Sequence, residues 1–319
     1  MTKSNTLTAG IDTAKDKLDI AVHGRKGTIT VANDETGWKE LADYLTKAGV
    51  ERVGIEATGG YERGVIRALQ NAGFTVHMLQ PLQVRAFATL HLKRAKNDRI
   101  DAALIAACTA MLGAQNRTPA DQRFDALMDH LTFIEQIEED IACFKTRLEH
   151  ISDKRLRRIV EAGIKRFEKL RAGEIKRLLG ELRLHADLAK RFELVLSIPG
   201  IGERTALAVV VRMPELGQVS REQAASLAGL APFVHQSGKR AGETHIGGGR
   251  ARLRRSLYAA ALPAAFHWNP ALKALYQRLI GRRTAHAAAL VACARTLLVF
   301  ANTVVARGTP WEERTPARA

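Results

Sequence analysis

The sequence predicts a mixed α/β domain at the N-terminus, followed by two predominantly helical segments. Short apolar or alternating runs, which are typical of strands, fill about the first eighty residues. From residue 121 to about residue 196, apolar residues instead recur at three- and four-residue steps, which is typical of long helices. With 319 residues, the chain is longer than the roughly 250–300 at which a single core usually stops growing, so we expect more than one domain.

Three strands are expected in succession near the N-terminus. Leu7–Asp12 is a short apolar run, while Leu18–His23 and Gly27–Ala32 alternate between apolar and polar residues. Helices and strands then alternate, and in chain order they are expected at Thr36–Ala48 (helix), Arg52–Glu56 (strand), 61–72 (helix), Thr75–Leu79 (strand), 83–91 and 98–112 (helices). An antiparallel meander followed by strands added through helical crossovers is the order of ribonuclease-H-like domains, although a fold alone does not fix a function.

The middle of the chain, residues 119–196, is expected to form long helices. Its apolar residues recur at helical steps, at Leu127, Leu131, Ile134, Ile137, Ile141 and Phe144. The pattern indicates an antiparallel coiled-coil arm or, equally, a helical spacer bundle. Either would suit a dimer contact or an RNA-binding arm. The remainder, residues 197–319, is expected to be helical with glycine-rich loops.

The charge balance favours a polyanionic partner. The chain carries 49 Lys and Arg against 33 Asp and Glu, which gives a formal net charge of +16 and a pI near 10.2. Nucleic acid is the usual partner of such a surface, through phosphate contacts and release of counterions. Aromatic residues make up only 5% of the chain, so base stacking is not expected to dominate the binding.

Cysteine use and the apolar stretches favour a cytoplasmic protein. The three cysteines are far apart and form no CxxC pair, which argues against a disulfide framework or a thiolate zinc site. No apolar signal core precedes Asp12. The most apolar late stretch, Ala287–Ala306, contains Arg295 and Asn302, so we expect a buried helix there and no membrane span.

Four acidic residues are expected to form a metal site. Asp12 ends the first strand and Glu56 ends the fourth, and these two strands are neighbours in the predicted sheet. Asp98 and Asp101 share one face at the start of a helix, because they are three residues apart. Four converging carboxylates repel one another unless a cation neutralises them, and oxygen ligands suit Mg²⁺ or Mn²⁺. Two such ions can stabilise both the entering and the leaving oxygen of a phosphodiester.

Each of these acids alone has a structural alternative. Asp12 alone fits a turn, and Asp98 fits a helix N-terminus, where the dipole favours a negative charge. Other acids lie nearby but are expected on solvated turns or faces, namely Asp16, Asp19, Glu51 and Glu62.

Two motifs in the last segment favour phosphate binding. Ile198–Gly202 resembles the glycine turn of a helix-hairpin-helix, in which Gly200 and Gly202 would expose backbone N–H groups to a phosphate. A tight turn between helices is an alternative that is compatible with this role. Further on, a flexible glycine-rich loop carries Ser237 and is followed by basic residues, namely Lys239, Arg240, Arg250, Arg252, Arg254 and Arg255. By itself, this run supports phosphate binding only, and Ser237 is then an ordinary loop serine.

Taken together, the motifs resemble those of the insertion-sequence one-ten transposases, the DEDD-type family that also includes the Piv-like DNA invertases. The resemblance spans nearly the whole chain and is carried by Gly10–Asp12, Glu56–Gly59, Lys96–Asp101, Ile198–Gly202, Gly229–Pro232, Gln236–Lys239, Leu257–Ala260 and Gly308–Trp311. It implies a RuvC-like domain over residues 1–118, a coiled-coil arm over 119–196 and a C-terminal transposase domain over 197–319.

The resemblance also assigns roles to the residues. It implies that the four acids bind Mg²⁺ or Mn²⁺, and that Ser237 attacks DNA and forms a covalent phosphoserine link. Ser226 and Ser256 are nearby alternatives, but neither lies beside glycine in a loop. The family further implies donor and target DNA, a structured noncoding guide RNA (the bridge RNA), and homodimers or homotetramers. In these, the RuvC-like domain of one subunit shares an active site with the serine domain of another.

Two other functions remain open from the sequence. The first is a metal-dependent junction nuclease, in which water cuts the DNA and the serine is dispensable. The second is a non-catalytic nucleic-acid scaffold that uses only the basic surface. All three functions predict binding that weakens steeply as salt rises, so salt dependence does not distinguish them.

Overall fold

The computed structural model describes residues 7–91, 98–112, 121, 123–237 and 240–312, with side chains described throughout except at 98–100, 234–237 and 240–244. Its contacts divide the chain into two units, residues 1–120 and 121–319. Each unit has its own hydrophobic core.

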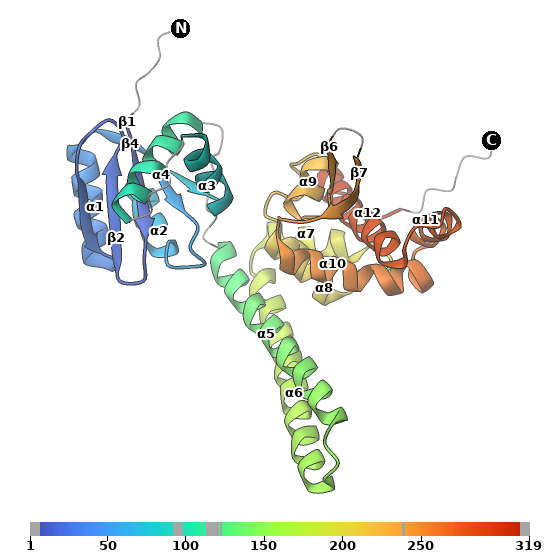
Figure 1. The fold of residues 1–319 in the computed structure, drawn as a ribbon. Helices are drawn as coiled ribbons and strands as arrows, with labels where there is room; N and C mark the ends of the chain where they lie inside the picture. The colour runs from blue at the N-terminus through green and yellow to red at the C-terminus, as the bar shows by residue number, and fades with distance from the viewer. Residues whose placement is uncertain (1–6, 92–97, 113–120, 122, 238–239, 313–319) are drawn as a thin grey trace. The chain divides into compact units, whose positions relative to one another are not determined.

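The first unit is built on a five-stranded sheet in the order β3-β2-β1-β4-β5 (Figure 1). Its strands are β1 (Leu7–Thr13), β2 (Lys17–Val22), β3 (Thr28–Ala32), β4 (Val50–Glu56) and β5 (Thr75–Leu79). The first three form an antiparallel meander, whereas β4 pairs in parallel with β1, and β5 in parallel with β4. The predicted mixed α/β order is therefore confirmed for this unit.

Helices cover both faces of this sheet. They are α1 (Glu35–Lys47), α2 (Arg63–Asn71), α3 (Pro81–Leu90) and α4 (Asp98–Leu112). The face with Ile11 and Ile55 packs against α1 and α2, whose apolar stripes are buried on it. The opposite face packs against α4, and Leu79 joins α3 and α4 in a smaller cluster. Because side chains alternate along a strand, each position of β1 and β4 is assigned to one of these faces.

A long helical hairpin opens the second unit. It consists of α5 (Arg123–Glu149) and α6 (Lys154–Arg183), which pack along each other (Figure 1). Ile137, Ile141 and Ile164 are buried between them, and the rings of Phe144 and Phe167 stack with centroids 5.7 Å apart. The predicted long helices are confirmed, whereas their description as a coiled coil stays a prediction.

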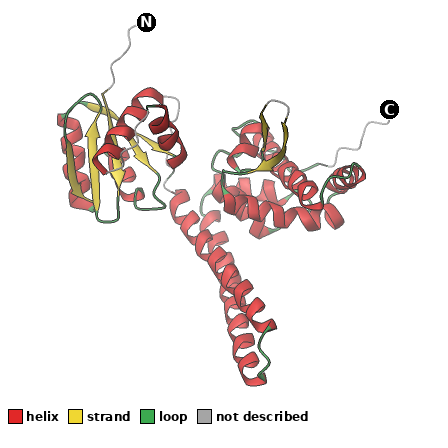
Figure 2. Ribbon diagram, viewed as in Figure 1, coloured by secondary structure: helices red, strands yellow, loops and turns green. Residues whose placement is uncertain are grey.

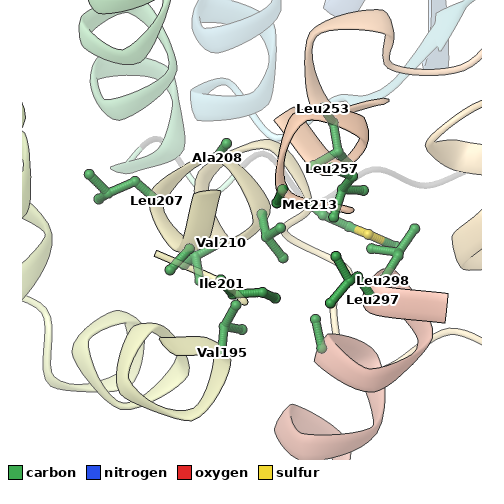
Figure 3. Packing of buried hydrophobic residues seen from close by; sticks show 14 of the residues in the cluster. Val195, Ile201, Leu207, Ala208, Val210, Met213, Leu253, Leu257, Leu297 and Leu298 are labelled. Atoms are coloured by element: carbon green, nitrogen blue, oxygen red, sulfur yellow. The ribbon is translucent and has the colours of Figure 1, made fainter. Parts of the chain in front are cut away.

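The rest of the second unit is mainly helical and closes around α8 (Glu203–Arg212). Residues 205–211 are all buried, so this short helix lies inside the core (Figure 3). The surrounding elements are α7 (Ala186–Leu196), α9 (Arg221–Leu227), α10 (Ala251–Pro263), a π-helical turn (Ala264–Trp268), α11 (Pro270–Gly281) and α12 (His286–Arg307). The base of the hairpin shares this core through Leu127, Leu131 and Leu178.

The second unit also contains two strands that were not predicted. β6 (Pro232–Ser237) and β7 (Arg240–Ile246) pair antiparallel as a hairpin, visible as the two strands of this unit in Figure 2. The expectation of a flexible loop around Ser237 is therefore wrong. Glycine is depleted in strands, and the glycines of this stretch concealed the alternation of Phe233 and its neighbours.

One described helix, α12, is long and apolar enough to cross a membrane. It packs against α10 and contributes Cys293, Leu297 and Leu298 to the core of its unit. This is the buried helix expected from the sequence, and burial in the core accounts for its apolar composition.

Replacing Gly10 with Ala is expected to destabilise the first unit. A Cβ at this position would lie 2.2 Å from the backbone N of Ala106 and 2.4 Å from the backbone O of Ala102, so β1 and α4 would have to separate. The expected cost is about 1–3 kcal/mol. Native-state hydrogen exchange of the sheet amides would measure it.

Gly180→Ala is the matched control for this change. A Cβ there meets nothing within 4 Å, and the residue lies inside α6. Alanine should therefore stabilise the hairpin by roughly 0.5–1 kcal/mol. If Gly10→Ala left the exchange of the sheet unchanged, the close packing of α4 on β1 would be disproved.

Candidate active site

Asp12 and Glu56 lie side by side at the ends of two neighbouring parallel strands. In the pairing of β1 with β4, the last pair is Ile11 with Ile55, and the two acids come directly after these residues. Both isoleucines are fully buried against α1 and α2. Because successive side chains point to opposite faces, Asp12 and Glu56 point to the face covered by α4, and both are partly exposed.

Helix α4 approaches this end of the sheet with its first turns. A Cβ at Gly10 would meet the backbone of Ala102 and Ala106, and a Cβ at Gly54 would lie 1.8 Å from Oγ1 of Thr109. Earlier on β1, the hydroxyl of Thr8 donates to the backbone O of Ala106 at 3.4 Å. Helix α4 therefore runs antiparallel to β1. The next residue of β1 on this face after Gly10 is Asp12, which accordingly lies toward the start of α4.

The two remaining acids of the predicted set belong to that helix start. Asp101 lies in the first turns of α4 and is half-buried, while Asp98 begins the helix. The side chain of Asp98 lies outside the described residues. The fold thus brings all four positions to one end of the sheet. Among the side chains that are described, no three acidic, histidine or cysteine residues lie close enough to hold a metal.

The donor chemistry of these four positions suits one class of metal. All four are carboxylates, and hard oxygen ligands fit Mg²⁺ or Mn²⁺ better than a soft metal. Glycine at positions 10 and 54 lets α4 lie directly on the strand backbones, with the start of the helix at the same end of the sheet as Asp12 and Glu56.

Asp19 is a further acid at this end of the sheet, and it is buried, although a solvated position was expected from the sequence. It lies on β2 directly opposite Asp12, and only 5% of it is exposed. Its carboxylate accepts a hydrogen bond from the hydroxyl of Thr30 at 2.5 Å and pairs with Nζ of Lys17 at 2.9 Å. The expectation of a solvated position was wrong, because Asp19 shares the face of Asp12 under α4. The register of the β1–β2 pair was the signal that could have shown it.

Glu62 was also expected on a solvated surface but is buried and shapes the loop after Glu56. Its Oε2 accepts hydrogen bonds from the hydroxyl of Thr58 at 2.6 Å, and from the backbone N–H groups of Gly60 at 2.9 Å and Thr58 at 3.2 Å. Burial alone would raise the pKa of Glu62. The hydrogen bonds from Thr58, Gly60 and its own backbone outweigh this effect and hold the pKa below its ordinary value.

The turn predicted to resemble a helix-hairpin-helix is tightly packed. Ile198 and Ile201 are buried in the core, and Gly200 adopts a φ of +94°. A Cβ at Gly200 would lie 2.4 Å from Cβ of Ala264, so both conformation and space require glycine. Gly202 caps α8 and is open to solvent on its Cβ side. Phosphate binding by this turn stays a prediction.

Ser237 is the last residue of β6 and pairs with Arg240 at the start of β7. The side chains of both residues, and all of Lys239, lie outside the described residues. The alternative nucleophile Ser256 is buried in α10, where its hydroxyl accepts a hydrogen bond from Arg204 at 3.1 Å and donates to the backbone O of Arg252. Burial makes Ser256 a poor nucleophile for DNA, whereas Ser237 is the last residue of a strand.

The four arginines that follow the β6–β7 hairpin, Arg250, Arg252, Arg254 and Arg255, all have partners within the second unit. Arg250 forms two hydrogen bonds with Glu215, at 2.7 and 2.8 Å, and Arg254 donates to the backbone O of Gly248 at 2.7 Å. Burial would raise the pKa of Glu215, but the hydrogen bonds and charge of Arg250 lower it below its ordinary value.

The other two arginines, Arg252 and Arg255, reach across to α5. Arg252 pairs with the buried Glu135 at 3.0 Å, which also binds Arg212 at 2.6 Å, and Arg255 pairs with Glu139. Glu135, Glu139, Arg252 and Arg255 border a cavity of about 220 Å³ between α5, α8 and α10. These ion pairs hold α5 of the helical hairpin against α10. DNA phosphates would therefore have to compete with Glu135 and Glu139 for the two arginines. Their predicted role in nucleic-acid binding stays a prediction.

Comparisons with known proteins fit this arrangement. Residues 9–154 match a family model described as "Transposase" for DEDD proteins of the IS110 type, and residues 192–277 match "Transposase IS116/IS110/IS902 family". The chain is 26% identical over 318 residues to the "Pilin gene-inverting protein" of Moraxella bovis. The matched region covers 96% of this chain and 97% of that protein. The protein of the same name from Moraxella lacunata is 27% identical over 319 residues, with the same coverage.

Two further similarities are more limited. An "Insertion element IS110 uncharacterized 43.6 kDa protein" of Streptomyces coelicolor is 33% identical over 123 residues, which are 38% of this chain and 30% of that protein. Among solved structures, T. thermophilus RuvC in complex with a Holliday junction substrate matches with a TM-score of 0.29 and 16% identity, over 35% of this chain and 100% of that chain. A score this low identifies no shared fold.

Replacing Glu62 with Gln is expected to loosen the loop after Glu56. Glutamine keeps one oxygen acceptor but loses the charge, so the expected cost at pH 7 is about 1–2 kcal/mol. Because the pKa of Glu62 is lowered in the folded chain, its contribution is fully present above about pH 4.3, the usual glutamate pKa, and is lost as pH falls through the lowered value.

The measurement is hydrogen exchange of the first unit at pH 7 and pH 3. Wild type and variant should differ at pH 7 and converge toward pH 3. Glu51→Gln, an exposed glutamate on β4, serves as control and should change neither value. An equal difference at both pH values would rule out the charge as its cause.

Proposed function

The chain belongs to the IS110 family of transposases, and from this premise we propose that it cuts and rejoins DNA through a serine nucleophile. Activity as a DNA transposase or recombinase follows from the two family matches and from the full-length pilin gene-inverting relatives. The observation that carries the proposal is the placement of four acidic positions at one end of the sheet, in the unit matched to the DEDD model. The strand order of that unit is also the one expected of ribonuclease-H-like domains.

We propose that Asp12, Glu56, Asp98 and Asp101 hold Mg²⁺ or Mn²⁺. When bound, such an ion neutralises charge on the phosphodiester and on the oxygens that enter and leave. The chain's own part is to orient the carboxylates. Asp12 and Glu56 are held by strand pairing, and the two helical acids by the packing of α4 against Gly10 and Gly54.

The proposed reaction is a pair of phosphoryl transfers. Oγ of Ser237 attacks a DNA phosphorus and loses its proton, while the bond from phosphorus to one deoxyribose oxygen breaks and that oxygen takes up a proton. In the second step, a deoxyribose hydroxyl of the partner strand attacks the phosphoserine, and Ser237 leaves with its proton restored. No bond is hydrolysed, so the energy of the phosphodiester is conserved for rejoining. The position of Ser237 at the end of a hairpin supports access to DNA.

A guide RNA and the sharing of active sites between subunits also belong to the proposal. Asp12 and its partners lie in one unit and Ser237 in the other, so each subunit supplies two separate halves of the chemistry. For the RNA, the candidate surface is α6, which carries eleven Lys and Arg against four Glu. Several of these cations are exposed, among them Lys165, Arg166 and Lys169. Phosphates are the natural partner of such a helix face.

The second candidate function is a metal-dependent junction nuclease in which water cuts the DNA. The same carboxylate end of the sheet favours it, because a metal ion held by such acids would also activate water. The two functions differ in whether DNA becomes linked to the protein.

Ser237→Ala is expected to abolish recombination between donor and target plasmids while leaving DNA binding intact. With wild type, a nicked suicide substrate should trap a covalent protein–DNA adduct, which the variant cannot form. Asp12→Asn should reduce recombination by at least about a hundredfold, in line with the loss of a metal ligand. DNA cutting by Ser237→Ala without an adduct would favour the nuclease.

Reversing the charge of Lys165, Arg166 and Lys169 to Glu together is expected to weaken binding of the element's noncoding RNA. Each lost phosphate contact lowers the slope of log K against log salt by about 0.7–0.9, so the slope should fall by about 2–3. The control changes exposed acids of α5, Asp140→Lys with Glu149→Lys, and should not weaken binding. RNA affinity and slope equal to wild type would exclude α6 as the RNA surface.

A further inference from the structure

Three segments meet at the sheet end that carries Asp12 and Glu56. The first is the turn after β1, which begins at Ala14. The second is the loop after β4, which reaches Tyr61, and the third is Asn33, the residue directly after β3. Lys17 pairs with Ala32 and Leu18 with Thr13, so the end of β3 lies at the same edge of the sheet as the end of β1.

The side chain of Asn33 joins the other two segments. Its Nδ2 donates one hydrogen bond to the backbone O of Ala14 at 2.9 Å and another to the backbone O of Tyr61 at 3.1 Å. Its Oδ1 accepts a hydrogen bond from Nε1 of Trp38 at 2.8 Å. The Asn33 amide therefore joins Ala14, two residues after Asp12, to Tyr61, five residues after Glu56.

The orientation of this amide is fixed by chemistry. An indole N–H only donates, so the atom that faces Trp38 must be the oxygen. Backbone carbonyls only accept, so the atom that faces Ala14 and Tyr61 must be the NH₂ group, and both of its hydrogens are used. A flipped amide would lose all three hydrogen bonds. Trp38 itself is held in place, because its ring lies directly over Gly64, where an added Cβ would be 2.2 Å from Cη2.

Both joined segments are stiff in themselves. The backbone N–H of Ala14 donates to the backbone O of Lys17 at 3.0 Å. The backbone N–H of Asn33 donates to the backbone O of Asp16 at 3.1 Å. On the other side, Glu62 closes the loop through Thr58 and Gly60, as described above. Because both segments are stiff, the hydrogen bonds of the Asn33 amide act on the strand ends to which the segments are attached.

We propose that Asn33 is a positioning residue for the carboxylate site: its amide ties together the segments after β1 and β4, beyond the last residues of the β1–β4 pair, and so maintains the separation of Asp12 and Glu56 that strand pairing establishes. This inference rests on the proposed metal site, and it adds a residue that touches neither the metal nor DNA. Outer residues that orient metal ligands typically change metal affinity by 10- to 100-fold when replaced.

The test is Mn²⁺ binding to the full chain, measured by calorimetry, in Asn33→Asp and Asn33→Ala. Aspartate keeps the acceptor for Trp38 but replaces the two donors by an oxygen that repels both carbonyls, and alanine removes the link without adding charge. Both variants should bind Mn²⁺ at least about tenfold more weakly than wild type. Trp38→Phe, which keeps an aromatic ring over Gly64 but removes the N–H donor to Oδ1 of Asn33, should lose a smaller factor.

Asp34→Ala is the matched control. Asp34 is the neighbour of Asn33 and caps α1 by accepting a hydrogen bond from the N–H of Gly37 at 2.9 Å, but it touches neither segment. This variant should lose thermal stability to a similar degree and keep the Mn²⁺ affinity of wild type. If Asn33→Ala bound Mn²⁺ as tightly as wild type, or if Asp34→Ala lost as much affinity, the positioning role would be disproved.

A second measurement separates this inference from the metal site on which it rests. Without metal, hydrogen exchange of the backbone amides at 14–16 and 57–61 should rise in both Asn33 variants and stay unchanged in Asp34→Ala. If wild type bound no Mn²⁺, the proposed metal site would fail, and the exchange data would still decide whether Asn33 links the two segments. Unchanged exchange at either segment would overturn the link.

Discussion

The contact between α4 and the backbones of β1 and β4 is the constraint on which the first unit depends. Glycine at positions 10 and 54 leaves room for the helix to lie directly on the strands, with Ala102, Ala106 and Thr109 as its contact residues. This packing fixes both the height and the direction of α4. The direction matters most, because it brings the start of the helix, and not its end, to the carboxyl ends of β1 and β4. A bulkier residue at either glycine would displace the acids as well as the helix.

Much of this arrangement was predictable, and the failures have physical causes. Alternating apolar residues gave the strands, and the position of Asp12 and Glu56 at strand ends followed from them. Asp19 was missed because burial of an acid depends on what covers it, and the cover comes from α4, some ninety residues later in the chain. The β6–β7 hairpin was missed because its glycines conceal the strand pattern. The partners of Arg252 and Arg255 lie more than one hundred residues away and leave no local signal.

The positive charge of the chain is not uniformly available to a ligand. The arginines of α10 neutralise acids of α5 and so stabilise the base of the helical hairpin, where Glu135 is buried between Arg212 and Arg252. A buried acid of this kind is tolerated only because it is paired with arginines. The exposed cations of α6, in contrast, lie on a helix with few acids. The basic residues of α10 therefore stabilise its packing against α5, whereas Lys165, Arg166 and Lys169 of α6 are exposed to solvent.

The indole of Trp38 gives the protein a built-in optical reporter. Its ring touches Gly64 at the start of α2, and its N–H is bonded to the amide that joins the strand ends. The other two tryptophans, Trp268 and Trp311, belong to the second unit, and Trp311 lies against Phe300 with ring centroids 4.3 Å apart. The tryptophan emission of the first unit therefore comes from one ring alone. With Trp268 and Trp311 replaced by phenylalanine, a change at this edge of the sheet would alter the fluorescence of Trp38 alone.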